Sequence, residues 1–295
     1  MATTDLPRRD DATGIDAQLS GLDALELELR PARGRAARLW SHLWPKALAV
    51  AIFLAFWQGV VWTGWRPEYL LPGPGKVFHT LYSNFGDLMD AAGTTLGRAV
   101  EGFGLAILIG STLGALVARS RVLRAAFGSL ITGLQTMPSI AWFPLAILLF
   151  KLTNGAILFV VVLGAAPSIA NGLISGIDHI PPLWLRAGRV LGAHGFATLR
   201  HVVLPASLPA FVAGLKQGWA FAWRSLLAGE LLVQIPGRFS LGERLEFARQ
   251  FSDAPSLISV MIVILVIGIL VDELLFGTAD RAIRRRYGLV DEATR

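Results

Sequence analysis

The sequence predicts an all-α integral membrane protein with about six transmembrane helices. Of its 295 residues, 54% are hydrophobic and 16% are charged, and the mean hydropathy is +0.56, which is too apolar for an ordinary soluble domain. Apolar runs recur at the length of roughly 20 residues that crosses the hydrocarbon core of a bilayer. The net charge of +6 does not indicate nucleic-acid binding, because the basic residues lie between these runs and not among aromatic residues on one face.

Six segments have the length and composition of membrane spans. Pro138, Pro144 and Pro209 interrupt the third and fifth, and helix bundles tolerate such breaks where neighbouring helices or cavities satisfy the freed backbone groups. The predicted spans are residues 46–64, 94–118, 125–150, 155–177, 205–233 and 256–276.

The connections between spans carry their own signals. Residues 66–76 are rich in proline and glycine, so the first span ends there and an interfacial segment at 77–88 follows. The connection 234–255 is long and charged, and we expect it to hold a short surface helix. GxxxG glycine pairs predict close helix packing, within the chain or against a second copy. These pairs are Gly110/Gly114, Gly172/Gly176 and Gly214/Gly218.

The positions of Lys and Arg predict the orientation, because basic loops stay on the cytoplasmic side. Eighteen of the 27 lie in the segment through Lys46, in the connections 119–124 and 178–204, and after the last span, whereas six lie in the opposite loops. Both termini are therefore expected in the cytoplasm. The expected domains are a partly disordered arm without a signal peptide (1–45), a transmembrane domain (46–280) and a basic cytoplasmic tail (281–295).

The connection 178–204 is long for a loop and has an organised pattern. Pro181 and Pro182 suit a helix start, and the residues that follow alternate an apolar face with basic positions. Gly192 and Gly195 then permit a sharp reversal towards the next span. This pattern predicts a short helix that lies flat and presents one face to a partner.

At these residues the chain resembles the permease subunits of bacterial ABC importers. Their cytoplasmic loop reads E-A-A, three residues, G, about nine residues and then I-x-L-P. The matching residues here are Ala187, Gly192, Ala193, Val202, Leu204 and Pro205. Arg186 stands where the signature has Glu, and Gly188 where it has its second Ala. LLPGPGKVFHTL, TLGRAVEGFGLAILIGSTLGALVARSRVLR, QTMPSIAWFPLAILLF and AFAWRSLLAGELL extend the resemblance to the sulfonate, taurine and nitrate branch, over about 70–287.

The resemblance implies a type I ABC importer fold with a cytoplasmic coupling helix. The implied partners are two ATPase subunits, a second copy of the permease, an extracytoplasmic substrate-binding protein and the lipid of a bacterial inner membrane, with no nucleic acid. Mg-ATP is expected on the ATPase, with no cofactor or metal in this chain. The branch implies alternating-access import of an aliphatic sulfonate, taurine or nitrate. The implied ATPase-coupling residues are Leu185, Arg186, Ala187, Arg189, Leu191, Gly192, Ala193, His194, Phe196, Leu204 and Pro205.

Charged residues inside the spans need partners or water, since each costs about 2.5–3.5 kcal/mol at the centre of a membrane helix. Arg98 and Glu101 are three residues apart and are expected to pair on one helix face. Arg224 has no acidic residue nearby on its own helix that faces it. We expect it either to face the pathway and attract an anion or to pair across helices with an acid such as Glu101.

Two groups of residues are candidates for the transport pathway. Lys216, Trp223 and Glu230 recur every seven residues and form one stripe, with Trp219 beside it, although Trp near a membrane boundary is commonly an interfacial anchor. Polar and proline residues in the third span suit a kinked gate. The candidates are Gln135, Met137, Pro138, Ser139, Trp142, Lys216, Trp219, Trp223, Arg224 and Glu230.

Several classes of catalytic site are missing from the sequence. There is no cysteine, the five His residues form no HExxH motif, and the GPGK at 73–76 lacks the first Gly and the Ser/Thr of a P-loop. The chain therefore cannot hydrolyse ATP by a P-loop mechanism. An ion-coupled secondary transporter is the alternative, but its inverted repeat and paired intramembrane acids are not evident. An intramembrane enzyme would need a catalytic constellation that the spans lack.

Overall fold

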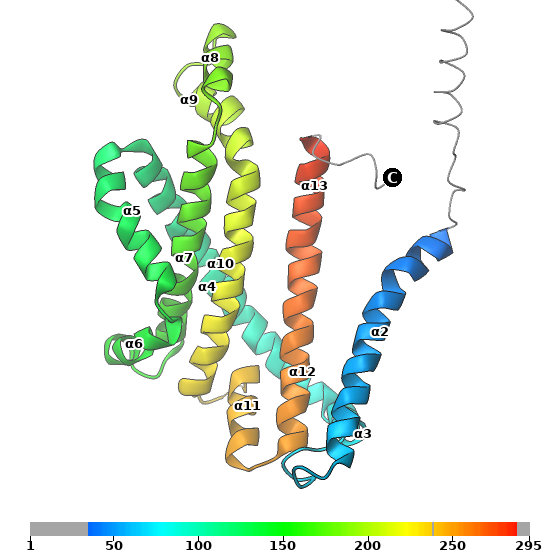
Figure 1. Ribbon diagram of the computed structural model, residues 1–295. Helices are drawn as coiled ribbons and strands as arrows, with labels where there is room; N and C mark the ends of the chain where they lie inside the picture. Colours follow the sequence, from blue (N-terminus) through cyan, green and yellow to red (C-terminus); the bar gives the residue numbers. More distant parts are fainter. Residues whose placement is uncertain (1–34, 238, 288–295) are drawn as a thin grey trace, which may run out of the picture. The chain divides into compact units, whose positions relative to one another are not determined.

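The computed structural model describes residues 35–237 and 239–287, in which all regular structure is helical (Figure 1). The chain divides into two units, residues 1–63 and 64–295. In the first unit, α2 (Arg35–Trp62) is a single helix.

Residues Leu43–Trp62 of α2 are long and apolar enough to cross a membrane. Because α2 already begins at Arg35, residues 35–45 of the predicted arm are helical and Pro45 lies inside the helix. The rest of the arm, Arg238 and the end of the predicted basic tail lie outside the described residues.

The second unit is a helical bundle with short connecting elements. In chain order it contains α3 (Pro74–Ser83), α4 (Phe85–Arg119), α5 (Arg121–Thr136), η1 (Ser139–Trp142), α6 (Phe143–Phe150), α7 (Asn154–Asp178), α8 (Pro182–Val190), α9 (Phe196–Thr198), η2 (Leu199–Val203), α10 (Leu204–Leu232), α11 (Leu241–Gln250), α12 (Ala254–Val271), η3 (Asp272–Gly277) and α13 (Thr278–Arg286). η2 and η3 are π-helical turns.

About six spans are confirmed within the described residues. Five helices are long and apolar enough to cross a membrane, and the bent pair of α5 with η1–α6 makes a sixth if it counts as one span. The third span, predicted at 125–150 with proline breaks, turns by 105° at Met137 and Pro138, where proline cannot donate a helical hydrogen bond. The fifth span begins earlier than predicted, since helix continues through η2 from Phe196 to Leu232.

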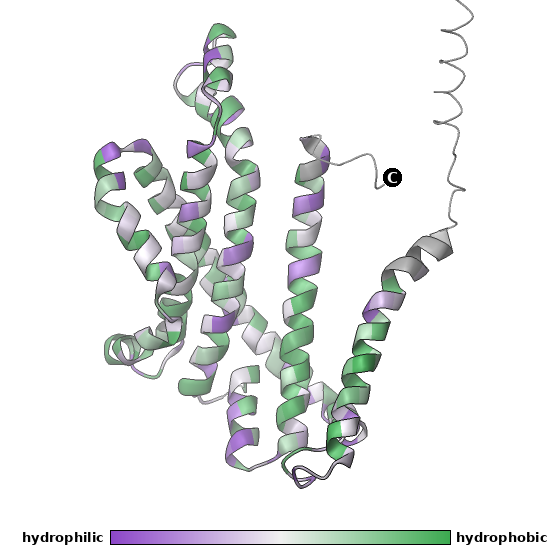
Figure 2. Cartoon of the chain, viewed as in Figure 1, coloured by the Kyte–Doolittle hydropathy of each residue, from purple (hydrophilic) through white to green (hydrophobic). Residues whose placement is uncertain are grey.

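Two connections between spans also differ from their predicted form. The interfacial segment 77–88 is divided, because α3 ends at Ser83 and α4 begins at Phe85. The helix expected in 234–255 is present as α11, but its first turn is buried instead of lying on the surface. Figure 2 shows the contrast between the polar colouring of α11 and the hydrophobic colouring along most of α12.

Helix α7 packs against both α4 and α10, and small residues allow the close approach. A Cβ added to Gly172 would lie 2.6 Å from the Cα atom of Gly214, and one added to Gly110 would lie 2.6 Å from the carbonyl oxygen of Ala166. The GxxxG glycines therefore serve packing within one chain. The core around them consists mainly of α4, α7 and α10 side chains, with Ile169 fully buried among them.

Candidate functional site

The connection between α7 and α10 folds into a small helical projection. α8 begins at Pro182, whose fixed φ suits the first helical position. The chain reverses at Gly192 and Gly195, whose φ angles of +86° and +54° lie in the left-handed region. The amide of Ala193 donates to the carbonyl of Gly188 at 2.9 Å and closes the end of α8. The short helix and the reversal that the sequence predicts are both present.

Large apolar side chains are displayed on this projection. Val190, Leu191 and Phe196 are 87%, 86% and 73% exposed. Contiguous apolar exposure marks a contact surface, and we call these three residues the apolar face of the projection. Leu185, Arg186, Ala187 and Arg189 lie on α8, Leu191, Gly192, Ala193 and His194 in the reversal, Phe196 on α9, and Leu204 and Pro205 at the start of α10. Their contact with an ATPase stays a prediction.

Gly188 has a steric reason to replace the alanine of the signature. It is buried, and a Cβ added there would lie 2.8 Å from Cγ2 of Val202, which is closer than side chains approach. The absence of a side chain at Gly188 therefore lets α8 pack closely against η2. Two further contacts anchor the same end of the unit: Arg124 pairs with Asp178 at 2.7 Å, and the Tyr287 hydroxyl donates to the carbonyl of Pro205.

The predicted gate lies at the break between α5 and α6. Met137 and Pro138 are extended, and Ser139 and Trp142 bound the short helix η1. Gln135, in the last turn of α5, is fixed to α7. Its amide nitrogen donates to Ser168 Oγ at 2.9 Å, and its carbonyl oxygen accepts from Asn171 at 2.5 Å. The kink predicted from the sequence is therefore present, and its role as a gate stays a prediction.

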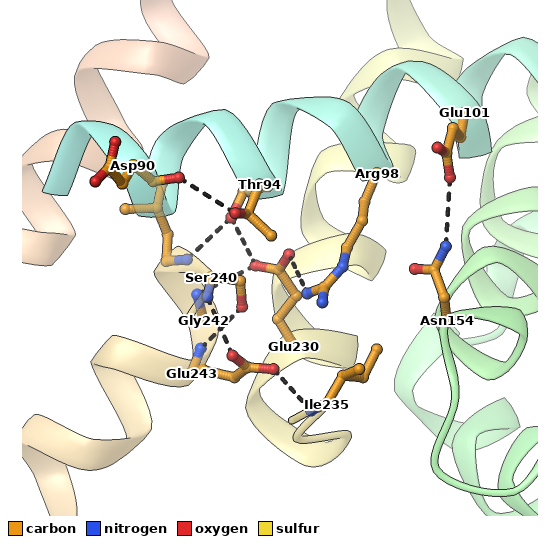
Figure 3. A network of polar contacts seen from close by, with 12 residues as sticks. Asp90, Thr94, Arg98, Glu101, Asn154, Glu230, Ile235, Ser240, Gly242 and Glu243 are labelled. Atoms are coloured by element: carbon orange, nitrogen blue, oxygen red, sulfur yellow. Dashed lines mark hydrogen bonds and ion pairs between the residues drawn. The ribbon is translucent and has the colours of Figure 1, made fainter. Parts of the chain in front are cut away.

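The expected Arg98–Glu101 pair is wrong, as Figure 3 shows. Arg98 Nη1 donates instead to Glu230 Oε1 at 3.0 Å, and Glu101 accepts from Asn154 at 3.3 Å. The side chains of Arg98 and Glu230 are 10% and 0% exposed. A fully buried carboxylate needs several donors, and Glu230 obtains them from two other elements.

Glu230 links α4, α10 and the start of α11. Its Oε2 accepts from the amide of Gly242 at 3.2 Å (Figure 3) and from Thr95 Oγ1 at 2.9 Å, and Thr95 Oγ1 accepts from the amide of Leu241 at 2.9 Å. We call Arg98, Thr95, Glu230 and the two amides the Glu230 network. Sequence reasoning missed Thr95 and Gly242, because nothing local to them indicates a carboxylate from another helix.

A capping box completes this end of the bundle. Ser240 Oγ accepts from the amide of Glu243, and Glu243 accepts from the amides of Ser240 and Ile235 at 3.1 and 2.9 Å. The pattern Ser-x-x-Glu at 240–243 is a sequence signal for such a helix start. It could have placed the beginning of α11.

Arg224 lines a cavity of about 600 Å³ beside α10, α11 and α12, together with Trp223 and Asp272. The Arg224 side chain is exposed, and its guanidinium lies 5.7 Å from the ring centroid of Phe221. The alternative ion pair with Glu101 is not formed. Lys216 pairs with Asp272 at 3.1 Å, which neutralises that acid.

The predicted stripe on α10 does not face one surface. Trp219 is 7% exposed and belongs to the core, where its ring lies 5.3 Å from that of Phe103, centroid to centroid. Glu230 is fully buried in its network. Lys216 and Trp223 stay accessible, and Trp219 and Trp223 line the same cavity as Arg224, so the pathway role of these residues stays a prediction.

Residues 106–285 match the family described as the binding-protein-dependent transport system inner membrane component. The chain belongs to this family. It is 33% identical over 209 residues to a protein of Methanocaldococcus jannaschii that is named as an ABC transporter permease, covering 69% of this chain and 78% of that protein. It is 30% identical to the bicarbonate transport permease of Synechococcus elongatus (60% and 63% covered) and 25% identical to the nitrate import permease of Synechocystis sp. (77% and 84% covered).

The fold of the permease is that of type I ABC importers. It matches an inward-facing MetNI methionine ABC transporter with a TM-score of 0.57 at 19% identity, covering 69% of this chain and 97% of that one. A histidine-containing structure of an amino acid ABC transporter matches with a TM-score of 0.57 at 14% identity, covering 70% and 98%. These likenesses concern the fold alone.

Family membership settles the class of the protein. The permease is a multi-pass inner-membrane subunit and not an enzyme, and separate subunits hydrolyse ATP. A substrate-binding protein and ATPase subunits are its general partners. The secondary-transporter and intramembrane-enzyme alternatives are excluded.

Proposed function

We propose that the permease imports a small solute with an anionic group, an aliphatic sulfonate or taurine, by alternating access as a homodimer. The observation that carries the anion proposal is Arg224, an accessible cation within a membrane-spanning helix that lines a cavity of about 600 Å³. A cation at that depth is costly unless it has a function or a partner. Of the two acids that line the same cavity, Asp272 and Glu273, Asp272 is already paired with Lys216.

The relatives support an anionic substrate in a second way. Two of them are named for bicarbonate and nitrate, and both of these substrates are small anions. These names also make nitrate the second candidate for this chain. Nitrate and an organic sulfonate differ in their apolar part, so a substrate panel separates them.

The coupling mechanism follows from the exposed projection. ATPases that close on Mg-ATP would draw two projections together, one from each permease, and open the bundle to a loaded binding protein. The apolar face at Val190, Leu191 and Phe196 would seat in the ATPase. With the projection and both termini in the cytoplasm, the opposite end of α10 faces the binding protein.

The test is ATP hydrolysis by the permease reconstituted in lipid with its ATPase and binding protein. Taurine, longer alkanesulfonates, nitrate and uncharged solutes are compared. We expect stimulation by taurine or a sulfonate only when all components are present. In Arg224→Gln the ratio of stimulated to basal hydrolysis should fall about tenfold or more, as for the loss of a charged hydrogen bond. Lys76→Gln, which removes an exposed cation paired with Glu68, is the matched control.

Four outcomes would contradict parts of the proposal. Stimulation by nitrate alone would establish the second candidate. Equal stimulation by uncharged solutes would remove the anion proposal, and so would an unchanged response in Arg224→Gln. Native mass spectrometry should find two permeases and two ATPases in the complex, and a single permease would contradict the homodimer.

A further inference from the structure

A second cavity, of about 310 Å³, lies at the end of the bundle opposite the helical projection. It is formed where α11 meets the start of α4 and the start of α12, and its volume is in the range of small-molecule sites. The residues that the argument uses are Phe239, Arg244, Phe247, Phe251 and Asp253. We call it the outer cavity.

Three phenylalanine rings give the outer cavity an aromatic wall. The rings of Phe239 and Phe247 lie 5.5 Å apart, centroid to centroid, at an interplanar angle of 76°, and those of Phe247 and Phe251 lie 6.5 Å apart at 15°. Phe239 and Phe251 are exposed. The faces of such rings attract organic cations.

The cavity also holds one cation with unused donor capacity. Arg244 lies with its Cζ 5.9 Å from the Phe239 ring centroid, and its Nη2 forms an ion pair with Asp87 at 3.5 Å, which is longer than a charged hydrogen bond. Its Nε is buried and has no hydrogen-bond partner among the described residues. A guanidinium presents five N–H donors, so Arg244 can still bind an acid group.

One acid lines the outer cavity beside this cation. Asp253 is exposed, and one of its carboxylate oxygens accepts from the amide of Ser256 at 3.2 Å, which caps α12. The other oxygen has no role in the cap. Asp87 and Asp90 line the adjoining groove, so among the described residues that line the two cavities, acids outnumber bases by three to one. A ligand with only negative charge would be repelled by these carboxylates.

We infer that the outer cavity binds a small zwitterion, with its acid group on Arg244 and its ammonium group facing Asp253 and the phenylalanine rings. Such a ligand leaves neither charge of the cavity without a partner. Nitrate has no cationic end, and an alkanesulfonate has none either. The inference rests on the proposed function and sharpens it, because it selects taurine and related amino acids of short carbon chain over nitrate and the alkanesulfonates.

Binding of labelled taurine to the permease–ATPase complex in nanodiscs, without binding protein, tests the inference. Ethanesulfonate, ethylammonium and nitrate serve as competitors. We expect taurine to bind and each single-charge competitor to bind about tenfold or more weakly. Arg244→Gln and Asp253→Asn should each weaken taurine binding by about tenfold to a hundredfold. Asn caps a helix as well as Asp does, so Asp253→Asn removes the charge and keeps the cap.

Arg249→Gln is the matched control. Arg249 lies on α11 like Arg244 but pairs with Glu246 and does not line the outer cavity, so its loss should leave taurine binding unchanged. Thermal unfolding of each variant separates loss of binding from loss of fold. If Arg244→Gln fails to assemble, Asp253→Asn carries the test.

Equal binding of ethanesulfonate and taurine would overturn the inference, and so would unchanged taurine binding in Asp253→Asn. Failure of the proposed function gives a different result. If taurine binds as expected but neither stimulates ATP hydrolysis nor is transported, the binding site in the outer cavity is supported and taurine as the transported substrate is contradicted. If transport of taurine continues unchanged in Arg244→Gln and Asp253→Asn, the binding site is contradicted and taurine as the substrate is supported.

Discussion

The two ends of α10 differ in which side chains they bury and which they expose. At the end near Leu232, polar groups are buried and satisfied, because Glu230 accepts hydrogen bonds from Arg98, Thr95 and Gly242. At the end near Leu204, the apolar face of the projection is almost fully exposed. The first region is complete within one chain, whereas the second is incomplete until another surface covers it. Changes at the two ends should therefore be read out differently, in stability at one and in assembly at the other.

The largest effect is expected from Glu230→Ala. It leaves the buried Arg98 without a counter-charge, which should lower the free energy of unfolding by about 3–5 kcal/mol, measured by denaturant titration in micelles. Lys216→Met is the control, since Lys216 and Asp272 are 51% and 46% exposed and such a pair contributes about 0–1 kcal/mol. The double change of Arg98 and Glu230 to Met should recover most of the loss. An equal loss of unfolding free energy in Glu230→Ala and Lys216→Met would contradict the distinction between the buried and the exposed ion pair.

Changes on the apolar face should act on assembly instead. Leu191→Asp and Phe196→Asp should each weaken association with the ATPase by about 2 kcal/mol or more, about 30-fold, while the unfolding of the isolated permease stays the same. Phe251→Asp is the matched control, because Phe251 is 77% exposed but lies at the other end of the unit. Association can be measured by co-purification at graded ATPase concentrations. Loss of association in the control as well would mean that the effect is not local.

Gly188→Ala should have a smaller effect, although it restores the residue of the family signature. The added methyl group would press on Val202 and displace α8 from η2, at a cost of about 1–3 kcal/mol shared between stability and ATPase association. Val202→Ala in the same chain should relieve the contact and recover association. Tighter association in Gly188→Ala alone would show that the contact has no such role.

The smallest effect concerns Glu246 on α11. Hydrogen bonds from Arg249 and Gln250 lower the pKa of Glu246 from its usual 4.5 to about 2. Because the pKa is lowered in the folded state, this pairing stabilises the protein above about pH 4.5 and is lost as the pH falls towards 2. The stability difference between the wild type and Glu246→Gln should be constant from pH 8 to 5 and shrink below that. A change between pH 8 and 5 would contradict this assignment.

Sequence reasoning worked where the signal is local. The apolar runs gave the spans, and Pro182, Gly192 and Gly195 gave the helix and reversal of the projection, because proline and glycine limit the backbone directly. The Arg98–Glu101 prediction failed because spacing shows which residues share a helix face but not what packs against it. Glu230, 132 residues away, offers a carboxylate already held by other donors.

The bend between α5 and α6 combines a local signal that was read correctly with contacts that were not predicted. Pro138 interrupts the helical hydrogen bonding and so predicts the kink. Gln135 then finds partners on α7 that no local pattern identifies. The outer cavity was likewise not evident in the sequence, since Arg244 and Asp253 line one cavity only when α11 packs against α12.

The most direct test of the central claim is uptake of labelled taurine into proteoliposomes that hold the permease, its ATPase and its binding protein. Uptake should require ATP and binding protein, ignore proton and sodium gradients, and be lost in Leu191→Asp. Uptake that persists without ATP and follows an ion gradient would contradict the account, and so would full ATP-driven uptake in Leu191→Asp.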